Sequence, residues 1–128
     1  MKIAVETALV TSPYLYNNII IMEFKELLEF INLENKRLIK KFGRNSTQQE
    51  KILARTVKLT EELGELCNEV LVFNGDQRQE KLNKYNKNNL PNEFADVIIT
   101  ALLLAKSMDV DIKKALTDKI KKINKRYK

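Results

Sequence analysis

Glu61-Glu62-Leu63-Gly64-Glu65 and the later stretch Glu93-Phe94-Ala95-Asp96 decide the expected fold, because each carries carboxylates three residues apart. Three residues is just under one helical turn, so each pair shares a helix face, with Cβ atoms about 5–6 Å apart. Two such helices packed as antiparallel neighbours, about 8–10 Å between axes, would bring both pairs to one point. Clustered carboxylate oxygens are the ligands that Mg²⁺ or Mn²⁺ prefers. The carboxylates expected to form this metal site are Glu62, Glu65, Glu93 and Asp96.

The composition of the chain predicts a single all-α domain. It has 128 residues, of which 44% are hydrophobic and 31% charged, an ordinary balance for a globular protein. With three glycines and two prolines there is little to interrupt long helices. No apolar run reaches the roughly 18–20 residues that a membrane-spanning helix needs, and we expect no contact with a membrane.

The distribution of charge favours an anionic partner. The chain carries 23 Lys and Arg against 17 Asp and Glu, a formal net charge of +6. Acidic residues concentrate in 61–69 and basic residues in 113–128. The basic residues fit a phosphate ligand, a nucleic acid or a membrane surface, and equally an ordinary solvated protein surface.

The cysteine and histidine content excludes several kinds of active site. Cys67 is the one cysteine, so no internal disulfide can form and a reducing cytoplasm is expected. The absence of His removes Ser-His-Asp and Cys-His triads and His-ligated zinc. Cys67 is therefore predicted to be a buried, unreactive thiol.

The periodicity of apolar residues predicts four main helices after an N-terminal arm, residues 1–21, that has no clear period. Gly43 is expected to end the first helix, and Thr47 with Glu50 has the spacing of a capping box at the start of the second. Asn92 is the expected N-cap of the third. The predicted helices are 23–41, 48–73, 92–108 and a last helix from Asp109 or Asp111 to Tyr127, with a short helix or a loop within 76–90.

The third predicted helix has almost no polar face and is therefore expected in the core. Asp96 lies one turn inside it between apolar neighbours, so its carboxylate is predicted to be buried. A buried carboxylate needs a bound metal or a cationic partner. Lys58 and the lysines of the last helix are the candidate protein partners. The inner stripe expected for the last helix is Ile112, Leu116, Ile120 and Ile123.

Three stretches together resemble the MazG-like all-α nucleoside triphosphate pyrophosphohydrolase family over about residues 22–128. They are Lys58-Leu59-Thr60-Glu61-Glu62-Leu63-Gly64-Glu65-Leu66, then Glu93-Phe94-Ala95-Asp96-Val97-Ile98, then the Lys-rich tail Lys119-Ile120-Lys121-Lys122-Ile123-Asn124-Lys125-Arg126-Tyr127. The resemblance implies a four-helix bundle-like MazG-type domain over 22–128.

The resemblance also implies an activity, namely hydrolysis of (d)NTP to (d)NMP and pyrophosphate with Mg²⁺, for which Mn²⁺ is a substitute. The metal set is the same four carboxylates, and either Glu61 or Glu65 would orient or deprotonate the attacking water. Homo-oligomers, dimers or tetramers, are the expected assembly. The residues expected to contact the substrate are Lys58, Lys119, Lys122, Asn124 and Arg126.

Two non-catalytic alternatives stay open on the sequence alone. One is a helical module that binds nucleic acid through its basic tail, and the other is a regulatory bundle that binds a protein partner. The low aromatic content, nine Phe and Tyr with no Trp, and the absence of helix-turn-helix spacing disfavour nucleic acid.

Overall fold

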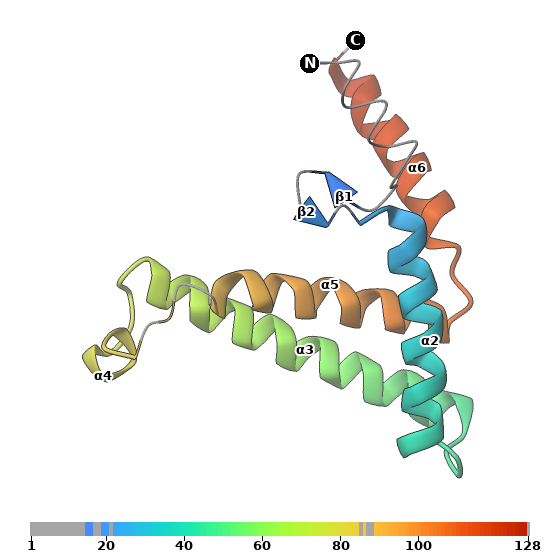
Figure 1. The fold of residues 1–128 in the computed structure, drawn as a ribbon, viewed down its shortest axis with the longest axis horizontal. Helices are drawn as coiled ribbons and strands as arrows, with labels where there is room; N and C mark the ends of the chain where they lie inside the picture. The colour runs from blue at the N-terminus through green and yellow to red at the C-terminus, as the bar shows by residue number, and fades with distance from the viewer. Residues whose placement is uncertain (1–14, 17–18, 21, 85, 87–88, 128) are drawn as a thin grey trace.

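The computed structural model describes residues 15–16, 19–20, 22–84, 86 and 89–127, and it is almost wholly helical (Figure 1). The short strands β1 (Leu15–Tyr16) and β2 (Ile19–Ile20) pair antiparallel; the rest of the predicted arm lies outside the described residues. The predicted all-α class is confirmed. The helices are α2 (Phe24–Phe42), α3 (Gln48–Phe73), α4 (Gln79–Leu82), α5 (Asn89–Ser107) and α6 (Ile112–Asn124), followed by a 3₁₀ turn at Lys125–Tyr127.

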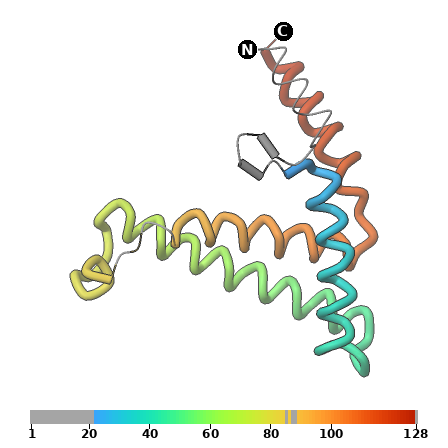
Figure 2. Tube along the Cα trace, in the orientation of Figure 1, coloured from blue at the N-terminus to red at the C-terminus, as the bar shows by residue number. Residues whose placement is uncertain are grey.

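Two long helices, α3 and α5, lie side by side in opposite directions and form the main helical pair (Figure 2). The second helix starts and ends where the sequence predicts. At its start, the backbone N–H of Glu50 donates to Thr47 Oγ1 at 3.1 Å, and that of Thr47 donates to the Glu50 carboxylate at 2.9 Å. This capping box satisfies two amide groups that the first turn leaves unpaired. At its end, Gly75 has φ 76°, a left-handed conformation that glycine adopts without strain.

The third predicted helix begins earlier than expected, because Asn92 is not its N-cap and α5 already starts at Asn89. Pro91 lies in the first turn, where its missing N–H would have no helical partner in any case. Asp111, by contrast, caps α6 by accepting from the backbone N–H of Lys114 at 2.9 Å.

The core lies where α2 crosses the C-terminal half of α5. Ile31 of α2 is buried against Leu102 and Leu103 of α5. The partly buried side chains that pack around them are Leu27, Leu38, Ile99 and Ile112. Because α2 crosses only this end, no third helix among the described residues covers the N-terminal half of α5, which packs on α3.

This open arrangement overturns three expectations about burial. In α5, Phe94 and Ile98 are 50% and 52% exposed, so the helix is not buried all round. Cys67 is exposed, because no described helix covers its face of α3. The expected inner stripe of the last helix is exposed beyond Ile112, since α6 extends away from the α3–α5 pair (Figure 1). None of the described helices is both long enough and apolar enough to cross a lipid bilayer.

Candidate metal centre

Arg55 fixes how α3 and α5 are aligned. Its Nη1 donates to the carbonyl oxygen of Leu103 at 2.9 Å and also to Ser107 Oγ, in the last turns of α5. The C-terminal end of a helix carries partial negative charge, so a guanidinium is well suited there. Burial lowers the pKa of Arg55 from its ordinary value.

This alignment places the two carboxylate motifs opposite each other. From Arg55 to Glu62 is seven residues along α3, and from Leu103 to Asp96 is seven residues back along α5. Each step is about 10 Å at the helical rise of 1.5 Å per residue. The antiparallel pair therefore brings Glu62 level with Asp96, as the sequence spacing predicts.

Three carboxylates converge at this level. One oxygen each from Glu62, Glu93 and Asp96 lie within 4.8 Å of one another. Glu62 is only 7% exposed, whereas Glu93 is partly buried and Asp96 is exposed. The predicted burial of Asp96 is therefore wrong, because the half of α5 that carries it has α3 on one side only. Glu62 is the buried acid of the cluster.

Lys58 lies beside this cluster. Its Nζ is 2.8 Å from Glu62 and 3.2 Å from Glu61, so it pairs with the acids of its own helix and not with Asp96 as expected. These two carboxylates raise the pKa of Lys58 well above its ordinary value. The ammonium group therefore stays protonated and partly balances the cluster.

Glu93 is a carboxylate of the cluster with a buried oxygen that has no hydrogen-bond donor among the described residues. Its Oε2 is buried and accepts no hydrogen bond. Burial raises the pKa of Glu93, and the negative charges of Glu65, Asp96, Glu62 and Glu69 raise it further. An unpaired carboxylate among like charges is costly unless a cation neutralises it. The oxygen donors and the orphan oxygen therefore fit a hard divalent cation.

A pocket of about 400 Å³ opens beside this cluster, lined by Glu61, Gly64, Glu65, Asn68, Glu69 and Glu93. Glu65 lines this pocket but stands outside the group of three converging carboxylates. Sequence reasoning did not select Asn68 or Glu69 as site residues, although the spacing of Glu65 and Glu69 signals a shared face. Lys81 of α4 donates to Asn68 Oδ1 at 2.7 Å, which ties the intervening loop to the pocket.

Four of the five residues predicted to contact substrate lie away from this pocket within one chain. Lys119, Lys122 and Asn124 lie on α6, and Arg126 lies in the 3₁₀ turn after it. This helix leads away from the α3–α5 pair that carries the carboxylates (Figure 1). Of the predicted cations, the single chain brings only Lys58 to the cluster among its described residues.

A family model described as the MazG-like family matches residues 53–128, more than half of the chain. The chain belongs to the MazG-like family. No curated protein and no solved structure gave a match.

The MazG-like match contains both carboxylate motifs and the basic tail, and it leaves out α2 and the start of α3. The predicted family is therefore confirmed, with a matched region shorter than the expected 22–128. Membership makes the chain a module of the nucleotide pyrophosphohydrolase type. The acidic cluster of this MazG-like module is able to bind a metal ion.

Proposed function

We propose that this protein is a Mg²⁺-dependent nucleotide pyrophosphohydrolase that converts (d)NTP to (d)NMP and pyrophosphate. The observation that carries the proposal is the buried, unpartnered Oε2 of Glu93 beside Glu62 and Asp96. Membership of the MazG-like family supports the substrate class. We further propose that the protein acts in the cytoplasm, where an exposed single cysteine stays reduced.

Glu62, Glu93 and Asp96 would hold the ion, with Mn²⁺ as a substitute, and Glu65 would complete the set or act on water. When bound, Mg²⁺ supplies Lewis acidity and neutralises charge on the phosphates. The buried position of Glu62 supports its role, because a buried carboxylate keeps one orientation. Asp96 would be the ligand of this set that is most open to solvent.

Glu65 is the better candidate for orienting the attacking water. Glu61 is held by Lys58 at 3.2 Å, whereas Glu65 is in no salt bridge among the described residues and lines the pocket next to Glu93. A free carboxylate is able to accept the proton of a water that attacks the α-phosphorus. The bond from that phosphorus to the bridging oxygen then breaks, and pyrophosphate leaves.

The exposed apolar faces support a homo-oligomer, a dimer or a tetramer. On α3, a row of uncharged side chains faces solvent over five helical turns. Contiguous exposed apolar surface of this kind marks an interaction site. The large hydrophobic side chains exposed on α3 are Leu53, Val57, Leu63, Val70, Leu71 and Phe73.

The test is pyrophosphate release from a panel of canonical and modified dNTPs and NTPs, with Mg²⁺, with Mn²⁺ and with EDTA. We expect metal-dependent release with NMP as co-product. Glu62→Gln and Asp96→Asn should each lower the rate about 100-fold or more, since each removes a charge at the reacting phosphates. Glu29→Gln, an exposed acid of α2, is the matched control and should be fully active.

Two outcomes would contradict the proposal. If Glu62→Gln and Asp96→Asn were as active as Glu29→Gln, the assigned site would be wrong. If the folded protein released no pyrophosphate from any nucleotide with either metal, the non-catalytic helical module would be the better reading, with α6 as its basic binding surface.

A further inference from the structure

The helices α2, α3 and α5 border a second pocket, near the end of α5 that lies farthest from Glu93. We call it the junction pocket; its volume is about 310 Å³, and it shares no lining residue with the pocket beside the carboxylates. Arg55, which lines the junction pocket, precedes Glu62 by seven residues, about 10 Å along α3 at 1.5 Å per residue. The junction pocket is therefore a separate feature of the fold.

Positive charge dominates the lining of the junction pocket. Lys51 and Arg55 come from α3 and Lys106 from α5, whereas Asp109 is the one acid among the described residues that line it. A pocket lined mainly by one sign of charge concentrates ligands of the opposite sign. Three cations against one acid favour a doubly charged anion.

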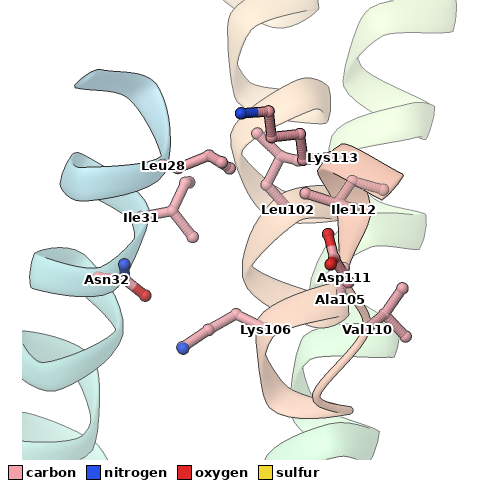
Figure 3. A pocket seen from close by; sticks show the side chains of 10 residues that line it. All are labelled: Leu28, Ile31, Asn32, Leu102, Ala105, Lys106, Val110, Asp111, Ile112 and Lys113. Carbon is pink, nitrogen blue, oxygen red and sulfur yellow. The ribbon is translucent and has the colours of Figure 1, made fainter. Parts of the chain in front are cut away.

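The two lysines approach the junction pocket from different helices. A Cβ added at Gly43 would lie 3.2 Å from Lys51 Cε, so the stem of Lys51 crosses the glycine that ends α2. Lys106, which also lines the pocket drawn in Figure 3, extends from α5 toward α2. Neither Nζ is in a hydrogen bond or a salt bridge within the described part of the chain. Both ammonium groups are thus available to a ligand.

Arg55 also has donors left for an anion. Within the described residues its Nη1 alone is engaged, by Leu103 O and Ser107 Oγ. A guanidinium carries five N–H donors, so Nε and Nη2 still offer three. Arginine binds phosphate oxygens through two parallel hydrogen bonds. Arg55 is therefore able to hold a phosphate and its contacts with α5 at the same time.

The size and polarity of the junction pocket define the body of the ligand. Small-molecule pockets measure about 300–1,000 Å³, so this one suits a compact molecule larger than a single ion. Ile39 is the one apolar side chain among its described lining residues, which disfavours an aromatic or acyl body. The amide of Asn35 and the carboxylate of Asp109 are suited to hydroxyl groups instead. A phosphomonoester, with a charge of about −1.5 to −2 at neutral pH, meets the charge requirement.

We propose that the junction pocket binds a small phosphomonoester with a hydroxylated body, its phosphate held by Lys51, Arg55 and Lys106. A ligand held from both α3 and α5 would tie these helices together in the alignment that Arg55 sets. Because that alignment brings Glu62 level with Asp96, occupancy of the junction pocket should favour metal binding at the carboxylates. The binding stands apart from the proposed function, whereas the coupling rests on its metal centre.

Binding is tested by titration calorimetry in EDTA with ribose 5-phosphate as the probe. We expect the wild type to bind it, and to show no binding of ribose, which lacks the phosphate. The double variant K51M/K106M keeps two unbranched stems and removes two of the three cations, so its Kd should rise at least about tenfold. The matched control K36M/K40M removes two exposed lysines of α2 that do not line the pocket, and it should bind as the wild type does.

Three results would overturn the site, once circular dichroism has shown that each variant is folded. One is a wild type that does not bind ribose 5-phosphate at millimolar concentration. Another is a Kd for K51M/K106M equal to that of K36M/K40M. The third is inorganic phosphate binding as tightly as ribose 5-phosphate, because a site for an ester should gain affinity from the hydroxylated body.

The coupling is tested by titrating Mg²⁺ into the protein with and without saturating ribose 5-phosphate, in the absence of nucleotide. We expect the Kd for Mg²⁺ in the wild type to fall about fivefold or more when the junction pocket is filled. In K51M/K106M the two titrations should agree, which also corrects for Mg²⁺ that the sugar phosphate binds in solution. By reciprocity, Mg²⁺ should tighten the binding of ribose 5-phosphate to the wild type by the same factor.

The outcomes separate this inference from the proposed function. Equal Kd values for Mg²⁺ with and without ribose 5-phosphate in the wild type would overturn the coupling and leave the proposed function intact. A wild type that bound ribose 5-phosphate but no Mg²⁺ would sink the proposed metal centre together with the coupling, while the junction pocket remained a binding site. Glu62→Gln should lose affinity for Mg²⁺ and still bind ribose 5-phosphate in EDTA, as two separate sites require.

Discussion

At the scale of single residues, Glu93 is expected to destabilise the metal-free fold and to help bind the proposed ion, and one substitution tests both effects. Its Oε2 is buried without a donor, and the surrounding carboxylates repel its charge. Glu93→Gln should therefore raise the Tm of the protein in EDTA at neutral pH. The same variant should lose the stabilisation that Mg²⁺ gives the wild type. Thermal unfolding with EDTA and with Mg²⁺ measures both effects.

The difference in stability between Glu93→Gln and the wild type in EDTA should depend on pH in one direction. Because the pKa of Glu93 is raised above its ordinary value of 4.5, the folded state holds the proton to higher pH than the unfolded state does. The stability of the metal-free wild type therefore falls as the pH rises through that window. The advantage of Glu93→Gln in EDTA should shrink as the pH is lowered. An advantage that did not change with pH would show that Glu93 bears no unfavourable charge.

The hydrogen bonds of Arg55 lead to a second prediction about a single residue. Arg55→Met keeps an unbranched apolar stem but removes the guanidinium that donates to Leu103 O and Ser107 Oγ. Leu103 O would keep the hydrogen bond from Ser107 Oγ, but Ser107 Oγ would lose its donor, so the change should cost about 1–3 kcal/mol of unfolding free energy. Mg²⁺ should also stabilise the variant less, because Arg55 aligns Glu62 with Asp96. Urea unfolding with and without Mg²⁺ measures both effects. Arg37→Met is the control, because Arg37 is exposed and pairs only with Glu34 on its own helix, and its unfolding free energy should change by about zero.

At the scale of the helix, Gly64 is a residue of low helix propensity in the middle of α3. A methyl group added there would meet open space in the structure, so nothing in the packing requires glycine. Gly64→Ala should therefore stabilise the protein by roughly 0.5–1 kcal/mol. The methyl group would, however, project at the pocket that Gly64 lines with Glu61 and Glu65, and we expect weaker nucleotide binding and a higher KM.

Thr60→Ala is the matched control for this trade-off, because Thr60 is an exposed residue of the same helix that does not line the pocket. It should gain stability without a change in KM. Chemical denaturation and steady-state kinetics on the two variants distinguish them. Equal KM values in Gly64→Ala and wild type would show that substrate does not lie against this turn of α3.

At the scale of the whole molecule, the chain is an open set of helices that leaves large apolar faces on α3, α5 and α6 uncovered. If these faces meet those of a second copy, folding is coupled to association. The Tm should then rise with protein concentration, as mass action requires for an oligomer. Ile120→Lys, in the stripe of α6, should abolish that dependence, and Lys121→Ala should not. A Tm independent of concentration for the wild type would contradict the proposed oligomer.

The sequence by itself determined the main helices and both ends of α3, because those depend on neighbouring residues. Thr47 and Glu50 form their capping box across three positions, and Asn74-Gly75 ends α3 by local backbone geometry. Helical spacing likewise put Glu62 beside Glu65 and Glu93 beside Asp96 on their own helices. Asn92 was misplaced as a cap because Pro91 is tolerated inside the first turn of α5.

The tertiary structure alone decided which carboxylate is buried and what each charged residue faces. The apolar neighbours of Asp96 predicted burial, but burial depends on how many helices cover a turn, and α2 crosses α5 only near Leu102 and Leu103. Glu62 is buried instead, where α3 packs against α5. The direction of α6 likewise depends on the few residues that join it to α5. Helical periodicity carries no information about that direction.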